Sequence, residues 1–159
     1  MGQPVITEQA GEFRAALPEG GVLLGLDLGT QTIGTAFCDA GWSFATAAKT
    51  LPRGKFARDL AAIRGLVAER GVKGVVIGLP LNMDGTGGPR AQASRAFARN
   101  LAPLGLPVLL WDERWSTASA ERAMIAQDMS RAKRAVRIDS HAAAVILQAA
   151  IDRLAGGLF

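Results

Sequence analysis

Three short apolar runs divide this 159-residue chain. They cover residues 21–27, 75–79 and 107–111. Each has the length of a strand and is too short for an ordinary helix. The second and third runs are apolar without alternation, which is typical of parallel strands buried on both faces. The runs therefore predict a sheet with a parallel part.

Two more strands are expected directly after the first run, over Ile33–Cys38 and Trp42–Ala48. Tight turns at residues 29–32 and 39–41 would join them as an antiparallel meander. The spacing of apolar residues, together with capping and stop signals, then predicts helices in four places: residues 53–70, 89–102, 116–127 and 140–154.

The element order β-β-β-α-β-α-β-α-α predicts an α/β fold, a mixed five-stranded sheet with helices on both faces. A chain of this length holds one sizeable domain and is too short for two ordinary ones. We therefore expect a single domain over residues 21–159. Residues 1–20 show little patterning and end at a turn, so we expect an N-terminal extension that is poorly ordered.

Composition excludes several classes of protein. No apolar stretch approaches the roughly 18 residues that a membrane span needs. Residues 1–13 have no basic start followed by an apolar run, as a secretory signal would. The single cysteine, Cys38, excludes an internal disulfide and a Cys-rich zinc site, and the single histidine, His141, excludes a multi-histidine metal site. We expect a soluble protein of the reducing cytoplasm.

Acidic residues stand at the ends of three predicted elements. Asp27 ends the first apolar run, and Asp112 and Glu113 follow the run 107–111. Asp139 precedes the last helix. A carboxylate at the end of a buried strand needs a partner or a metal ion, because an isolated buried charge is too costly. Adjacent strand residues face opposite sides, so only one of Asp112 and Glu113 can share a site with Asp27.

Each of these acids also has a purely structural interpretation. Asp27 can accept hydrogen bonds from the amides of the 29–32 turn. Asp112 can form an ion pair with Arg114, and Asp139 can cap the last helix. The residues alone leave both interpretations open.

Separated carboxylates without a His or Cys cluster suit hard cations such as Mg²⁺ or Mn²⁺. Two such ions about 4 Å apart can activate a water and stabilise the leaving oxygen of a phosphodiester. The chain has a net charge of +4. Four of the seven residues from 131 to 137 are basic: Arg131, Lys133, Arg134 and Arg137. This basic run is either a solvated helix face or a contact for the phosphates of a nucleic acid.

Four segments together strongly resemble the YqgF/RuvX family of bacterial ribonuclease-H-like proteins. They are Leu24–Thr30 continuing to Gly34, then Gly78–Gly85, Asp112–Thr117, and Ile138–Gln148 after the basic run. The resemblance covers about residues 22–154, with the segments in matching order and spacing. Members of this family are described as pre-16S rRNA nucleases or Holliday junction resolvases.

The resemblance implies a ribonuclease-H-like sheet of order 3-2-1-4-5, with strand 2 antiparallel, and a carboxylate site that binds Mg²⁺ or Mn²⁺. Carried over by position, Asp27 is the acid of the first strand and Asp139 that of the last helix. The acid of the Asp-Glu-Arg motif is Glu113 or its neighbour Asp112. Further matched residues would contact phosphates of the nucleic acid or support the site: Arg114, Ser116 and Thr117.

Other positions near this site allow two interpretations or depart from the family. Asn82 and Asp84, in a glycine-rich loop, could contact substrate or serve the turn itself. His141 could act as a general acid or base, or be structural. The turn after the first strand reads Gln31-Thr32 where the family often has a basic pair. The fourth strand ends in Gly78-Leu79-Pro80, without the acid that classical junction resolvases and ribonucleases H place there, so nuclease activity could be weak or partner-dependent.

The expected function is that of a metal-dependent endonuclease that processes the 5′ end of precursor 16S rRNA, with ribosome-assembly proteins as further partners. The alternatives are a Holliday junction resolvase on branched DNA and a non-catalytic RNA-binding factor of ribosome assembly. A nucleotide-binding ATPase, which the segment Gly25–Thr30 also resembles, is disfavoured because such proteins close two domains of this kind on the nucleotide.

Overall fold

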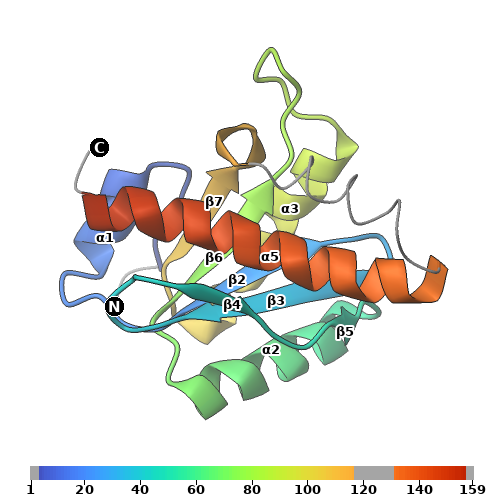
Figure 1. The fold of residues 1–159 in the computed structure, drawn as a ribbon, viewed down its shortest axis with the longest axis horizontal. Coiled ribbons are helices and arrows are strands. Elements are labelled where there is room, and N and C mark those ends of the chain that lie inside the picture. Colours follow the sequence, from blue (N-terminus) through green and yellow to red (C-terminus); the bar gives the residue numbers. More distant parts are fainter. Residues whose placement is uncertain (1–3, 117–130, 157–159) are drawn as a thin grey trace.

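The computed structural model describes residues 4–116 and 131–156, and for residues 131–139 it describes the helical backbone only. The strands form one seven-stranded sheet with helices on both faces (Figure 1). The strands are β1 (Ile6–Thr7), β2 (Leu23–Leu28), β3 (Thr32–Cys38), β4 (Ala45–Ala47), β5 (Leu51–Pro52), β6 (Gly74–Leu79) and β7 (Val108–Asp112). The helices are α1 (Ala10–Ala16), α2 (Phe56–Arg70), α3 (Pro89–Asn100) and α5 (Arg131–Gly156), with 3₁₀ turns η1 (Ala102–Leu104) and η2 (Glu113–Trp115).

The strand order across the sheet is β1-β7-β6-β2-β3-β4, and β5 also pairs with β3. β2 is antiparallel to β3 and parallel to β6, which is parallel to β7. The five predicted strands are β2, β3, β4, β6 and β7, so the predicted order 3-2-1-4-5 with strand 2 antiparallel is confirmed. As a consequence, the carboxyl ends of β2, β6 and β7 meet at one edge of the sheet.

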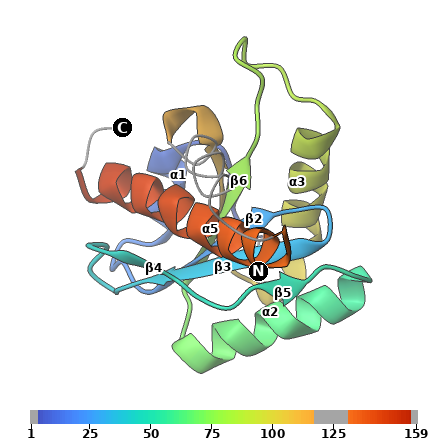
Figure 2. The same ribbon diagram turned by 45° about the vertical axis from the view of Figure 1, so that its right-hand side comes forward.

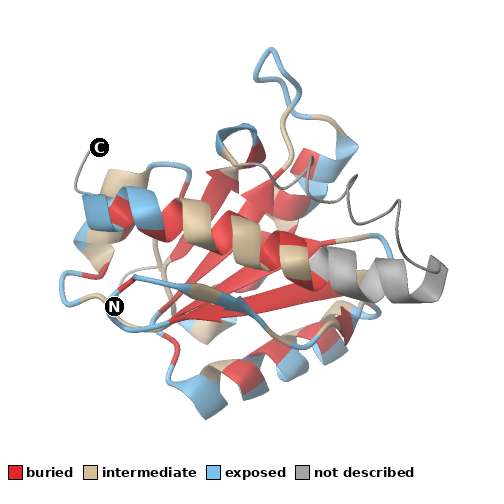
Figure 3. Ribbon diagram, viewed as in Figure 1, coloured by how far each residue is buried: buried red, intermediate tan, exposed pale blue. Residues whose placement is uncertain are grey.

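Strands β2, β3, β6 and β7 are buried along most of their length and separate two hydrophobic cores (Figure 3). Along β2, Leu24 and Leu26 face the core covered by α2 and α3, while Leu23 faces the core covered by α1 and α5. Figure 2 shows α5 lying across one face of the sheet with α2 on the other. Alternation along each strand therefore decides on which face a polar side chain lies.

The N-terminal segment differs from the sequence-based expectation of a poorly ordered extension. Ile6 and Thr7 form β1, which pairs in parallel with Val108 and Leu109 of β7. In α1, Phe13 is completely buried against the core beneath α5. A two-residue strand and a seven-residue helix give too little periodicity to be seen in the sequence, and their order comes from tertiary packing.

The third predicted strand begins later than expected, at Ala45 rather than Trp42. The carboxylate of Asp39 accepts backbone N–H bonds from Gly41, Ser43 and Phe44, at distances down to 2.7 Å. These bonds fold residues 39–44 into a turn in which Trp42 has a φ of 61°. Trp42 is nevertheless a core residue, 5% exposed.

The helix boundaries follow local signals. Gly71 ends α2 in the left-handed conformation with φ 61°, and Pro89 occupies the first position of α3. The last helix is longer than predicted, because it already includes Arg131. The predicted helix over 116–127 lies outside the described residues, apart from Ser116, which follows η2. No helix in the described part of the chain is long and apolar enough to cross a membrane.

Candidate active site at the carboxyl ends of the parallel strands

Asp27 is a buried carboxylate at the carboxyl end of β2, with 2% of its surface exposed. Leu26 and Leu28 face the core of α2 and α3, so alternation places Asp27 on the α5 face. Gly25 lies on that same face, and a Cβ there would come within 2.9 Å of Cβ of Leu147 in α5. Glycine at position 25 thus lets α5 pack closely over β2 beside Asp27.

Glu113 is buried, 7% exposed, and directly follows β7. A Cβ on Gly78 of β6 would lie 2.9 Å from Oε2 of Glu113 and 2.7 Å from Cδ1 of Ile146 in α5. The Glu113 carboxylate therefore lies over the backbone of β6, on the face that α5 covers. It occupies the space that a larger residue at position 78 would fill.

The register of the sheet brings Asp27 and Glu113 together. Leu26 pairs with Ile77, so Asp27 and Gly78 are the next residues along two adjacent parallel strands. Neighbouring strands lie about 4.8 Å apart. Because the Glu113 carboxylate lies over Gly78, the two buried acids occupy neighbouring positions on the same face, although 85 residues stand between them in sequence.

Asp112 belongs to the opposite face, as alternation along β7 requires. It caps η2 by accepting the N–H of Arg114, and Nη2 of Arg114 donates to its Oδ2 at 2.7 Å. Partial burial raises the pKa of Asp112, but the hydrogen bonds and charge of Arg114 outweigh it, so the pKa lies below its ordinary value. Of the two adjacent acids, Glu113 shares a face with Asp27 and Asp112 forms the ion pair with Arg114.

Arg114 also links η2 to the loop after β6. Its Nη1 donates to the carbonyl oxygen of Met83 at 3.2 Å, and its guanidinium lies 5.9 Å from the ring centre of Trp115. Trp115 and Met83 are 69% and 89% exposed. Ser116 donates its hydroxyl to the carbonyl oxygen of Glu113 at 3.1 Å. Thr117 lies outside the described residues.

Asn82 and Asp84 belong to a narrow loop that extends away from the sheet beyond β6 (Figure 2). Nδ2 of Asn82 donates to Oγ1 of Thr86 at 2.9 Å, and Thr86 donates its N–H and hydroxyl to Oδ1 of Asp84. These bonds lower the pKa of Asp84. Both side chains therefore stabilise the loop itself, which agrees with the turn interpretation of these two residues.

The backbone of α5 carries the remaining candidates. Asp139 lies one turn before Ala142 and Ala143, which are completely buried against the sheet. The side chains of Asp139 and of the basic run (Arg131, Lys133, Arg134 and Arg137) lie outside the described residues. His141 is half-buried next to Ser140, whose hydroxyl is hydrogen-bonded to Thr50. Within the described residues, no three His, Cys, Asp or Glu side chains gather as a metal cluster.

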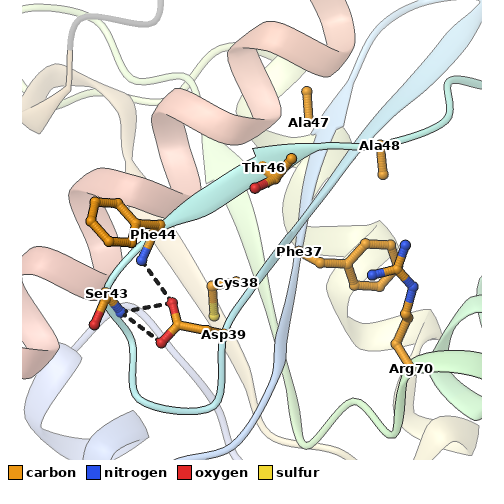
Figure 4. A pocket seen from close by; sticks show the side chains of 9 residues that line it. All are labelled: Phe37, Cys38, Asp39, Ser43, Phe44, Thr46, Ala47, Ala48 and Arg70. Carbon is orange, nitrogen blue, oxygen red and sulfur yellow. Dashed lines mark hydrogen bonds between the residues drawn. The ribbon is translucent and has the colours of Figure 1, made fainter.

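A cavity of about 640 Å³ lies at the opposite end of the sheet, between β3, β4 and the end of α2 (Figure 4). Its acid, Asp39, accepts the three backbone N–H bonds described above. Its cation, Arg70, lies 4.6 Å from the ring centre of Phe37. Burial raises the pKa of the Cys38 thiol to about 11. The polar groups of this cavity are engaged in local structure.

A family comparison identifies the group to which the chain is related. The family model of RuvX, described as Holliday junction resolvase, matches residues 21–153. The chain belongs to the RuvX family. This confirms the resemblance inferred from the four sequence segments.

Relatives of this RuvX-family protein match it over nearly its whole length. A protein of Novosphingobium aromaticivorans is 69% identical over 155 residues, which cover 98% of this chain and 100% of that protein. A protein of Sphingopyxis alaskensis is 68% identical over 150 residues, covering 94% and 99%. Both carry the name "Putative pre-16S rRNA nuclease".

The fold is similar to that of solved RuvC structures. RuvC of Thermus thermophilus, in complex with a Holliday junction substrate, superposes with a TM-score of 0.54, covering 86% of this chain and 97% of RuvC. Sequence identity over that superposition is 13%, so the similarity concerns the fold. The predicted ribonuclease-H-like α/β architecture of this RuvX-family protein is confirmed.

Proposed function

We propose that this protein is a cytoplasmic endonuclease that hydrolyses phosphodiesters with a divalent metal ion, Mg²⁺ or Mn²⁺, and that its substrate is precursor 16S rRNA. The observation that carries the proposal is the burial of Asp27 and Glu113 in neighbouring positions on one face of the sheet. Two carboxylates that approach each other out of water favour a cation between them.

The donor set fits such an ion. Carboxylate oxygens are the preferred ligands of Mg²⁺ and Mn²⁺, and glycine at position 78 leaves room for the Glu113 carboxylate over β6. In this proposal Asp27 and Glu113 hold the ion and Asp139 of α5 is a third ligand. An ion bound there supplies activation of a water and stabilisation of the leaving oxygen.

The names of the relatives favour rRNA as substrate, whereas the family description and the RuvC fold favour a branched DNA junction. The test compares cleavage of a labelled precursor-16S fragment with cleavage of a four-way DNA junction, each with Mg²⁺, with Mn²⁺ and with EDTA. We expect cleavage of the RNA with either metal and none with EDTA. Cleavage of the junction alone would contradict the rRNA assignment, and no cleavage of either would leave the non-catalytic RNA-binding factor.

Asp27→Asn should abolish that cleavage, by about 10²–10⁴-fold if several kcal/mol of transition-state stabilisation depend on the metal. Asp152→Asn is a matched control, because Asp152 is an exposed acid of α5 that accepts a hydrogen bond from Gln148. If both variants lose activity to the same degree, Asp27 has no special role.

The basic run is part of the same proposal. Residues 131–137 form the first turns of α5 and lead directly to Asp139, so a phosphate backbone bound at the acids would pass near them. Changing Arg131, Lys133, Arg134 and Arg137 to Ala should weaken RNA binding and lower its salt dependence by close to one log–log unit per lost phosphate contact. Unchanged affinity and slope in a folded variant would show that the run is only a solvated helix face.

A further inference from the structure

A smaller cavity of about 180 Å³ lies at the turn that directly follows Asp27. Two arginines reach it from different segments. Nη1 of Arg53, between β5 and α2, donates to the carbonyl oxygen of Gly29 at 2.7 Å. Nη2 of Arg90, in the first turn of α3, donates to the carbonyl oxygen of Leu28 at 3.3 Å. Both guanidinium groups therefore line the same cavity at the end of β2.

The positive charge of these two arginines is not neutralised within the described part of the chain. The ion pairs there are Arg95 with Glu8 and Arg114 with Asp112, and neither involves Arg53 or Arg90. Each guanidinium has five N–H groups and uses one of them for the carbonyl oxygen named above. Two cations that converge without a carboxylate favour an anion between them.

A third group in the cavity is independent of the arginines. Ser94 lines it from α3, one turn after Arg90, and is 3% exposed. Its hydroxyl has one O–H donor, which can bond to an oxygen placed in the cavity.

We propose that this cavity is a phosphate-binding site in which Arg53, Arg90 and Ser94 hold one phosphate group of a nucleic-acid strand. Guanidinium forks match the oxygens of a phosphate bidentately, and the N-terminal end of α3 adds a favourable helix dipole. The site rests on the proposed function for its ligand. It extends that function to a second contact. The cavity lies at the turn that follows Asp27, on the α3 side of the sheet, so a phosphate bound there would hold the nucleic-acid strand close to the acids.

Free inorganic phosphate could occupy the same site as a phosphate group of a nucleic-acid strand. Binding measurements distinguish these two ligands. The variants are Arg53→Gln/Arg90→Gln and Ser94→Ala, with Arg99→Gln as control, because Arg99 is an exposed residue at the end of α3. All are measured in EDTA, so that binding is observed without cleavage and the outcome does not depend on nuclease activity.

For a labelled precursor-16S fragment across a salt series, the double variant should lower the log–log slope by about 0.7–0.9, the value of one phosphate contact. Inorganic phosphate should raise the Tm of the wild type and of Arg99→Gln, relative to chloride at equal ionic strength, and not that of the double variant. Ser94→Ala removes one hydrogen bond to an anion and should weaken phosphate binding roughly tenfold.

If the double variant binds RNA with the wild-type slope but loses the phosphate-induced Tm shift, the cavity binds free phosphate, and the proposed contact with a nucleic-acid strand is overturned. A wild-type slope and no effect of phosphate on the wild-type Tm would overturn the site altogether. Ser94→Ala keeps both arginines, so it decides the question if the double variant fails to fold.

Discussion

The two ends of the sheet carry cavities of different size and different chemistry. At the end formed by the β3–β4 turn, about 640 Å³ is lined by an acid, a thiol and an arginine. At the other end, where β2, β6 and β7 finish, the cavity is about 180 Å³ and two arginines line it. Asp27 and Glu113 are buried at the same end, on the face that α5 covers.

The difference between the two ends lies in what holds the polar groups. Asp39 is bound by backbone N–H groups of its own turn, and the guanidinium of Arg70 from α2 lies over Phe37, so the acid of the large cavity already has its partners. Asp27 and Glu113 come from different strands, and Arg53 and Arg90 from different segments. Convergence of charged groups from distant parts of the chain, rather than volume, marks the end of the sheet that we assign to function.

The sharpest test of this comparison exchanges one carboxylate for an amide at each end. Glu113→Gln should lower RNA cleavage by about 10²–10⁴-fold, because the metal loses a charged ligand. Asp39→Asn should cleave like the wild type. Equal activity of the two variants, measured by initial rates at saturating metal, would remove the distinction between the ends.

A second test concerns the space over β6. Gly78→Ala places a Cβ within 2.9 Å of Oε2 of Glu113 and 2.7 Å of Ile146, so it should destabilise the fold by about 1–3 kcal/mol and displace the acid. Gly65→Ala is the matched control: nothing lies within 4 Å of its Cβ, and in an exposed helix position alanine should gain about 0.5–1 kcal/mol. Urea unfolding measures both, and a stable, active Gly78→Ala protein would contradict the geometry.

A third test uses the lowered pKa of Asp39, which the N–H groups of Phe44 and Ser43 keep below its ordinary value. A carboxylate with a lowered pKa in the folded state stabilises the protein above its unfolded pKa of about 3.9 and loses that contribution as pH falls through the folded value. Asp39→Asn should therefore be less stable than the wild type at neutral pH, and the difference in urea midpoint should vanish in acid. A difference that persists below the folded pKa would point to packing instead.

The smallest effect is expected at Cys38, whose pKa is raised to about 11 by burial. The thiol stays protonated at neutral pH, so alkylation of the folded protein should be slow and that of the urea-unfolded protein fast. Since the unfolded pKa is about 8.5, stability should be unchanged at neutral pH, where this effect is smallest, and should fall only as pH rises from about 8.5 toward the folded value. Cys38→Ala should lack this alkaline decrease.

Most of the sheet could be predicted from the sequence, because β2, β6 and β7 are apolar runs whose length and composition belong to buried strands. The face of the sheet on which Glu113 lies could not be predicted. Adjacent residues of a strand point to opposite faces, and the sequence does not show which of Asp112 and Glu113 points to the face of Asp27 until the strand pairing is known. Gly78, which makes room for the Glu113 carboxylate, acquires its meaning only when β6 is placed between β2 and β7.

Arg53 and Arg90 were missed for a related reason. In the sequence, Arg53 follows Pro52 and Arg90 follows Pro89, and each stands near the start of a predicted helix, as basic residues commonly do. Nothing local to either position indicates that both approach the turn after β2. Their convergence depends on how α2 and α3 pack on the sheet, which is a tertiary property.

The pairing of β1 with β7 joins residues that are about one hundred positions apart in sequence. Ile6 pairs with Val108, and Arg14 of α1 donates to the carbonyl oxygen of Leu154, near the end of α5. Contacts between residues this far apart in sequence form slowly compared with local helix formation, so we expect β1 and α1 to be among the last elements to reach their native positions.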